Sequence, residues 1–266
     1  MIRKLLLLVL ALVLVCGLAL YGIWVSLPLL LGGLARLVPV MWEEQLGQAV
    51  VAGMTRRSEL CDDSATRAEM DRVAGRVAAA IPSHPYSFRV LVVRRPEVNA
   101  LAAPGGHILV FSGLIERMEN GEQLAAVIAH EMQHVVQRHS IKGILRALGL
   151  QAALTLAVGD VGVLGGLAGN LTSLHFLRGD EQSADDAALA TLMRAGIPPE
   201  AMRRAFANLE REQRGQTPAV LRYLSSHPPL RERIERIESR SAAWRGPAIP
   251  LDVDFSRVCG GLAPHR

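Results

Sequence analysis

Aromatic side chains are scarce in this sequence, and long runs of one charge sign are missing. Phe, Trp and Tyr make up 4% of the 266 residues, whereas hydrophobic residues as a whole reach 50%. The core must therefore consist mainly of aliphatic side chains, in a chain long enough for one domain and an anchor. The net charge is +4, from 29 basic and 25 acidic residues, with no Lys or Arg tract. This argues against nucleic acid as a partner and only weakly for an anionic membrane surface.

Cysteine is also rare, with three residues at Cys16, Cys61 and Cys259. None of them has the C-x-x-C spacing of a cysteine zinc site, which argues against such a site. Cys61 and Cys259 flank the part of the chain that is predicted to fold. They can pair in an oxidising compartment or remain two free thiols, and the sequence leaves both alternatives open.

An uncharged stretch runs from Leu5 to Ala35. A membrane-spanning helix needs about 20 apolar residues and the core of a signal peptide only about 7–15, so this run is too long for a simple signal. We therefore predict an N-terminal segment over residues 1–35 whose residues 5–27 form an uncleaved transmembrane anchor, ended by Pro28. A cleaved signal peptide is the alternative.

Charge near the anchor predicts its orientation. Arg3 and Lys4 form a short basic tail, and such a tail usually stays in the cytoplasm. The rest of a single-pass chain would then lie outside the cytoplasm, on the periplasmic side of the inner membrane in a bacterium. Arg36, Arg56 and Arg57 on the other side of the anchor weaken this prediction.

The remaining chain is predicted to form an α+β domain that is predominantly helical, over residues 36–241, followed by a tail over 242–266. Apolar spacing and proline positions predict helices over 36–56, 64–80, 120–142, 181–195, 199–213 and 229–240. Ser64 is the expected N-cap of the second of these helices. Short β-branched or turn-bounded runs predict strands over 87–94, 97–102 and 107–112.

The sharpest chemical signal is the H-E-x-x-H sequence from His130 to His134. Residues four apart lie on one helix face, so His130 and His134 can meet one metal ion. Glu131 lies beside them, where it can take a proton from water that the metal activates. A solvated polar helix face is the alternative. The apolar residues 125–129 argue against it, because burying these groups without a metal would be costly.

A catalytic zinc needs a third protein ligand and one open position. Glu181 and Asp185 lie four apart on a predicted helix, so Glu181 can complete the ligand set. Asp185 can accept a hydrogen bond from a ligand histidine and set its tautomer. Acidic residues also suit the first turn of any helix, and that alternative is favoured for Asp180. Arg178 is a candidate partner of one of these carboxylates.

Further segments occur in an order that resembles a known family. These are Asn99-Ala100-Leu101, Pro104-Gly105-Gly106-His107-Ile108, Ser112-Gly113-Leu114, the H-E-x-x-H, Glu181-x-x-x-Asp185, Ser226-His227-Pro228-Pro229 and Arg233-Ile234. Over about residues 85–240 the chain is similar to the membrane-associated zinc metallopeptidases that include HtpX and the CAAX prenyl endopeptidase. The combination is far more specific than any one segment.

This resemblance implies a zincin-like fold of the gluzincin type and cleavage of peptide bonds. It implies that His130, His134 and Glu181 bind one Zn²⁺ per chain and that Glu131 is the catalytic base. The strand at Asn99, Ala100 and Leu101 is expected to bind an extended substrate as an added strand. The expected partners are protein or peptide substrates, such as misfolded or unassembled envelope proteins, and a membrane.

The sequence allows more than one interpretation of His227 and of residues 143–177. His227 can donate to the oxyanion of the reaction, close the open metal position, or act as a surface helix cap. His139 lies five residues after His134, so it is expected to point away from the metal. Residues 143–177 are apolar but too short for two membrane crossings, and one crossing would separate Glu181 from His130. We expect a helical hairpin or lid there.

Three functions are compatible with these residues. The first is a membrane-anchored zinc endopeptidase in envelope protein quality control. The second is a catalytically latent chaperone or assembly factor on a metalloprotease scaffold. The third is a structural membrane protein without a metal. Glu131→Gln separates the first two, since only the first loses its cellular role, and metal analysis excludes or supports the third.

Overall fold

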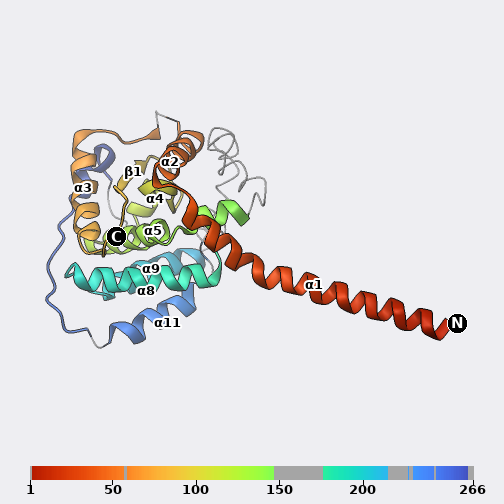
Figure 1. Cartoon of the computed structure of the whole chain (residues 1–266). Coiled ribbons are helices and arrows are strands. Elements are labelled where there is room, and N and C mark those ends of the chain that lie inside the picture. The colour runs from red at the N-terminus through yellow and green to blue at the C-terminus, as the bar shows by residue number, and fades with distance from the viewer. Residues whose placement is uncertain are drawn as a thin grey trace.

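The computed structural model describes residues 2–56, 59–146, 176–214, 227, 230–242 and 244–262. The described chain is mostly helical and contains one three-stranded sheet, which confirms the predicted α+β class. Helix α1 (Ile2–Leu37) extends away from a body that holds the other labelled elements (Figure 1). The predicted hairpin over 143–177 lies mostly outside the described residues, which omit 147–175.

Helix α1 does not end where the sequence predicted. It continues through Pro28 and Gly33 to Leu37. A proline removes one hydrogen bond and crowds the carbonyl four residues earlier, but the residues around Pro28 stay helical. The chain leaves the helix before Pro39, since a proline disfavours helical backbone at the residue before it. Within the part of the chain that the structure describes, no helix combines the length and the apolar character that a membrane crossing requires. The transmembrane anchor over 5–27 therefore stays a prediction.

The sheet has the strand order β1-β3-β2, and its three strands match the three predicted runs. Strand β3 (His107–Phe111) is central, parallel to β1 (Arg89–Val93) and antiparallel to β2 (Ala100–Ala102). Alternate side chains face two separate apolar clusters, as the period of a strand requires. One face packs on helices α3 and α5, and the other packs on α2.

The turn between β2 and β3 lets α2 approach the sheet closely. Gly105 and Gly106 have φ values of 72° and 97°, which only glycine adopts without strain. A Cβ at Gly105 would overlap the backbone of Glu44 in helix α2 (Val40–Met54). The Pro104-Gly105-Gly106 segment therefore joins two strands and also seats a helix on them.

The other helices are α3 (Ser64–Ala78), α4 (Ser112–Ile115), α5 (Gly121–Val136), α8 (Arg178–Arg194), α9 (Glu200–Arg214) and α11 (Leu230–Ser241). Helix α4 was not predicted, and α5 ends at Val136, before the predicted end at residue 142. The remaining four lie close to their predicted ranges. The predicted cap Ser64 was wrong by one residue. Asp63 caps α3 instead, because its carboxylate accepts a 2.8 Å hydrogen bond from the Thr66 N–H.

Part of the tail over 242–266 packs into the core. Leu251, Phe255 and Val258 are buried in the same core cluster as α3, around a short 3₁₀ segment (Phe255–Gly260). A disulfide between Cys61 and Cys259 fastens this segment to the residues before α3. Of the two alternatives for these cysteines, the structure has the pair.

Candidate metal centre

Helix α5 is buried along nearly its whole length. The Asn120 side chain caps it by accepting a 3.0 Å hydrogen bond from the Gln123 N–H, and every residue from Gly121 to Val135 except Glu122 is buried. His130, Glu131 and His134 have no exposed surface. The H-E-x-x-H motif is therefore part of the core, and the alternative of a solvated polar face is wrong.

Helix α8 packs beside α5 and brings acidic groups to the same place. Glu181 and Asp185 are each 2% exposed and lie one turn apart on α8. Burial of two carboxylates is costly unless each has a charged or metal partner. Their position against α5 supplies such partners.

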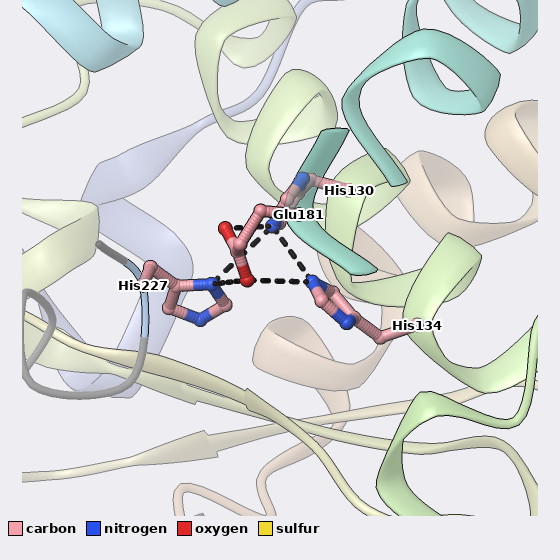
Figure 2. A group of neighbouring side chains, drawn as sticks. All are labelled: His130, His134, Glu181 and His227. Carbon is pink, nitrogen blue, oxygen red and sulfur yellow. Dashed lines mark hydrogen bonds and ion pairs between the residues drawn. The ribbon is translucent and has the colours of Figure 1, made fainter. Parts of the chain in front are cut away.

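Four side chains converge at one point (Figure 2). One ligand atom from each of His130, His134, Glu181 and His227 lies within 4.8 Å of the other three. His130 Nε2 is 2.9 Å from His134 Nε2 and 3.4 Å from His227 Nδ1. Glu181 Oε1 is 3.3 Å from His134 Nε2 and 2.9 Å from His227 Nδ1.

These separations fit a tetrahedral metal ion. Ligands about 2.0–2.1 Å from zinc lie about 3.3–3.4 Å from one another at the corners of a tetrahedron. Five of the six pairs among these four ligands have donor separations of 2.9–3.6 Å, and all donors lie within 4.8 Å of one another. Imidazole nitrogen and carboxylate oxygen are also the donors that zinc takes in proteins. The residues present therefore fit a zinc ion by donor type and by spacing.

Asp185 fixes the orientation of His130. Its Oδ1 lies 3.0 Å from His130 Nδ1, so Nδ1–H donates to the carboxylate and Nε2 keeps its lone pair for a metal. Arg233 of α11 donates to both oxygens of Asp185 at 2.7 Å and pairs with Glu181 Oε2 at 2.7 Å. The guanidinium lies 4.5 Å from the Phe206 ring centre, which keeps it in this position.

The arginine beside the carboxylates is thus Arg233 and not Arg178. The Arg178 side chain is exposed at the start of α8. The sequence suggested Arg178 because it precedes Glu181 closely in the chain. Arg233 comes from a different helix, and its occurrence after the Ser-His-Pro-Pro segment was the only signal that could have pointed to it.

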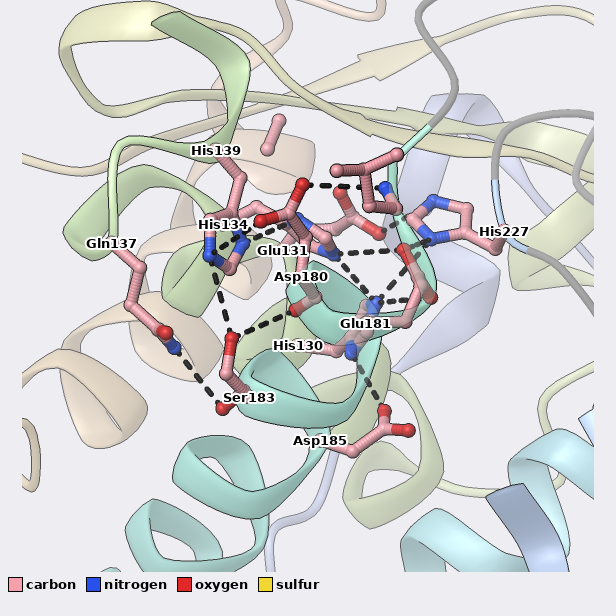
Figure 3. Close-up of polar contacts among 12 residues, drawn as sticks. His130, Glu131, His134, Gln137, His139, Asp180, Glu181, Ser183, Asp185 and His227 are labelled. Atoms are coloured by element: carbon pink, nitrogen blue, oxygen red, sulfur yellow. Dashed lines mark hydrogen bonds and ion pairs between the residues drawn. The ribbon is translucent and has the colours of Figure 1, made fainter. Parts of the chain in front are cut away.

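His139 lies at the site, although its spacing predicted otherwise (Figure 3). Its Nδ1 is 3.1 Å from His134 Nδ1, and its side chain is 2% exposed. The helical spacing argument does not reach it, because α5 ends at Val136 and Arg138 has a φ of 57°. If His134 Nε2 holds a metal, Nδ1 carries the proton and donates to His139.

Burial and charge set the protonation of the ligands. Burial lowers the pKa of His134 to about 4, so its imidazole is neutral near pH 7 and can bind a metal. Burial alone would raise the pKa of Glu181, but His227 and Arg233 outweigh it and hold that pKa far below the ordinary value. Arg233 and His130 likewise overcome burial and lower the pKa of Asp185 to about 2.

Glu131 is placed differently from the other carboxylates. Neither of its oxygens accepts a hydrogen bond from a residue that the structure describes. His227 Nε2 lies 3.5 Å from Glu131 Oε1. A buried carboxylate without such partners is costly to maintain, and it is available to bind a proton or a polar ligand.

Aromatic rings enclose the histidines. Phe176 stacks on His134 with ring centres 3.9 Å apart and lies 5.6 Å from the His227 ring. Phe206 contacts His130 edge-on at 5.9 Å. His227 itself has no exposed surface, so its interpretation as a surface helix cap is wrong. These rings exclude water from the ligands, which strengthens electrostatic interactions at the centre.

Comparison with known proteins identifies a family. The profile of peptidase family M48 matches residues 62–241. The chain is 31% identical over 173 residues to "Mitochondrial metalloendopeptidase OMA1" of Schizosaccharomyces pombe, covering 64% of this chain and 51% of that protein. It is 32% identical over 179 residues to "Metalloprotease LoiP" of Escherichia coli, covering 64% and 69%. It is 27% identical over 229 residues to "Beta-barrel assembly-enhancing protease" of Escherichia coli, covering 80% and 46%. The chain thus spans about half the length of two of these relatives.

Proposed function

The chain belongs to peptidase family M48 and is a metallopeptidase, and on this premise we propose that it is a membrane-anchored, zinc-dependent endopeptidase of envelope protein quality control. The observation that carries this proposal is the convergence of His130, His134 and Glu181, with the carboxylate of Glu131 beside them and without a hydrogen-bond donor among the described residues.

His130, His134 and Glu181 would hold the zinc ion, one per chain. When bound, the ion supplies a Lewis acid that activates water and polarises the scissile carbonyl. Asp185 and His139 hold the two imidazoles in the tautomers that leave Nε2 free as a donor.

Glu131 would move the proton of the reaction. Its carboxylate oxygens accept a proton from the attacking water and then deliver it to the nitrogen of the leaving amine. No other hydrogen bond needs to break first, because neither oxygen accepts one from the described residues.

His227 supports either of two roles. In the open enzyme its ring would donate a hydrogen bond to the oxyanion of the reacting carbonyl. As the structure places it, Nδ1 lies 2.9 Å from Glu181 Oε1 and 3.4 Å from His130 Nε2, where it can act as a fourth ligand. A fourth protein ligand closes the position that a catalytic zinc needs open. This favours a second candidate function, a latent form that acts as a chaperone or assembly factor.

The substrate would bind along β2 as an added strand. The backbone of Asn99 bonds to Phe111, and that of Ala103 bonds to His107. In an antiparallel ladder the intervening residues Ala100 and Ala102 therefore direct their N–H and C=O groups to the outer edge. Within the Asn99-Ala100-Leu101 segment, Ala100 would offer these groups to an extended chain, so the substrate segment must be unfolded or flexible.

Helix α1 would anchor the enzyme, with the catalytic domain on the periplasmic side if the source is a bacterium. The support is the uncharged stretch from Leu5 to Ala35, together with exposed apolar side chains such as Leu10 and Leu14. Misfolded or unassembled envelope proteins are the substrates proposed. One relative is named for mitochondria and another for β-barrel assembly, which fits work at a membrane.

Glu131→Gln tests this function in the full-length protein in detergent. The variant should bind zinc as the wild type does, at one ion per chain, and lose at least about 100-fold of casein cleavage, because a positioned base contributes about 10²–10⁴ in rate. Cellular proteomics should show envelope proteins accumulating. If wild-type protein holds no zinc, or the variant still cleaves, the proposal fails.

His227→Ala separates the two candidate functions. An open enzyme would lose activity without its oxyanion donor, whereas a latent one would gain activity once the fourth ligand is removed. Cells that are fully rescued by Glu131→Gln would favour the chaperone or assembly role.

A further inference from the structure

Arg138 has an unusual backbone for its residue type. It follows the end of α5 with a φ of 57°, and its N–H donates a 2.8 Å hydrogen bond to the Val135 carbonyl. Helices often end on such a left-handed residue, but glycine or asparagine usually supplies it, because a Cβ is strained there. The arginine side chain makes contacts here that glycine could not make.

That side chain binds the end of helix α1. Nη1 donates to the Ala35 carbonyl at 2.7 Å and to the Val38 carbonyl at 3.0 Å. The last carbonyls of a helix have no partner within the helix and carry partial negative charge, so a cation satisfies both needs. Ala35 is fully buried, whereas Leu37 is 76% exposed, so this end of α1 is docked on one side only.

The same guanidinium also contacts α2 and the loop before β1. Nε lies 3.1 Å from the Tyr86 hydroxyl and 3.2 Å from Glu43 Oε1. Tyr86 in turn donates to Glu43 at 3.1 Å, and both side chains are buried. Arg138 thus joins α1, α2 and the body of the protein at a single point.

The backbone turn at Arg138 aims the next residue at the metal centre. His139 Nδ1 reaches 3.1 Å from His134 Nδ1, the nitrogen that does not face the other ligands. On its other side, His139 Nε2 lies 3.4 Å from Ser183 Oγ and 3.6 Å from Asp180 Oδ1. Arg138 therefore binds the end of α1 through its side chain. Its backbone turn also orients His139, the hydrogen-bond partner of the ligand His134.

We propose that Arg138 is a positioning residue that couples the end of helix α1 to His134 through His139. This inference rests on the proposed function only because it takes His134 as a zinc ligand. When α1 is docked, Arg138 holds the turn, and His139 holds the His134 ring for metal binding. When the end of α1 is displaced, the turn loosens and zinc affinity falls.

Arg138→Gly separates the side chain from the backbone, because glycine can adopt the left-handed turn without strain but has no side chain to hold it against α1. In the full-length protein in detergent, the zinc dissociation constant should rise about 10–100-fold, as it does when the hydrogen-bond partner of a metal ligand is disturbed. Arg138→Lys should recover part of the affinity, since it restores one cation near the carbonyls. In a His139→Phe background, Arg138→Gly should change the constant little further.

A matched pair on α1 tests the coupling without touching the turn. Ala35→Phe places a ring in the buried side of the docked helix end, whereas Leu37→Phe places the same ring in solvent. Ala35→Phe should weaken zinc binding as Arg138→Gly does, and Leu37→Phe should leave it at the wild-type value. This pair also decides the matter if Arg138→Gly does not fold.

Two results would overturn the inference. If Arg138→Gly lowers only the melting temperature of the zinc-free protein and leaves zinc affinity unchanged, Arg138 is a structural residue. If Ala35→Phe binds zinc as tightly as Leu37→Phe, α1 is not coupled to the site. Wild-type protein that binds no zinc would instead refute the proposed function itself, so the two failures are distinguishable.

Discussion

Reduction of the Cys61–Cys259 disulfide should destabilise the protein strongly, because this disulfide closes a very long loop. The two cysteines are 198 residues apart in sequence. Chain-entropy arguments give about 18 cal/mol/K for a loop of this length, or about 5 kcal/mol at 25 °C. Measured values often fall below this limit, so we expect a loss of about 2–5 kcal/mol.

Urea unfolding of a Cys16→Ser protein, followed by tryptophan fluorescence with and without a phosphine reductant, measures the effect. Cys16 is exposed and free, and removing it prevents disulfide exchange. The unfolded, unreduced protein should show no reactive thiol, and the reduced protein should show two. A change in unfolding free energy below about 1 kcal/mol on reduction, with both thiols titrated, would refute the loop argument.

Two further predictions concern stability. Burial raises the pKa of Glu43 to about 7 against the attraction of Arg138, so between about pH 4.5 and 7 the folded state keeps a proton that the unfolded state has released. The unfolding free energy of the zinc-free protein should therefore fall by about 3 kcal/mol as pH rises through this window, and Glu43→Gln should remove that fall. Equal dependence of the unfolding free energy on pH in the two proteins would contradict this. Gly75 lies in α3 with open space around it, so Gly75→Ala should raise the unfolding free energy by about 0.5–1 kcal/mol. The control Gly113→Ala should lower the unfolding free energy by about 1–3 kcal/mol, because its Cβ would overlap the Pro96 carbonyl. Urea titration measures both variants, and a higher unfolding free energy in both would contradict the packing.

The parts of the site that follow from helix periodicity could be predicted from the sequence. His130 and His134, and likewise Glu181 and Asp185, lie four residues apart within one helix, so each pair must share a face. The small sheet and most helix ranges also follow from local patterns: β-branched or turn-bounded runs for the strands, and apolar spacing and proline positions for the helices.

Features that depend on where a helix stops, or on distant packing, could not be predicted. His139 reaches the site because the chain turns at Arg138, and no spacing rule crosses that turn. Arg233 reaches Asp185 across about 50 residues of sequence, whereas proximity in the chain favours Arg178. The tail is buried because its few apolar residues fit against α3, which a short stretch without periodicity does not reveal.

The shortness of β2 would limit sequence selectivity if substrates bind along this strand as proposed. Three residues give an outer edge with only the backbone groups of Ala100 and Ala102, and the Ser140 hydroxyl already donates to the Ala102 carbonyl. A bound chain would form only a short ladder, and both residues that offer it backbone groups are alanines. Under the proposed mode of substrate binding, selection would then rest on whether a stretch of polypeptide is flexible enough to lie along β2, and little on its sequence.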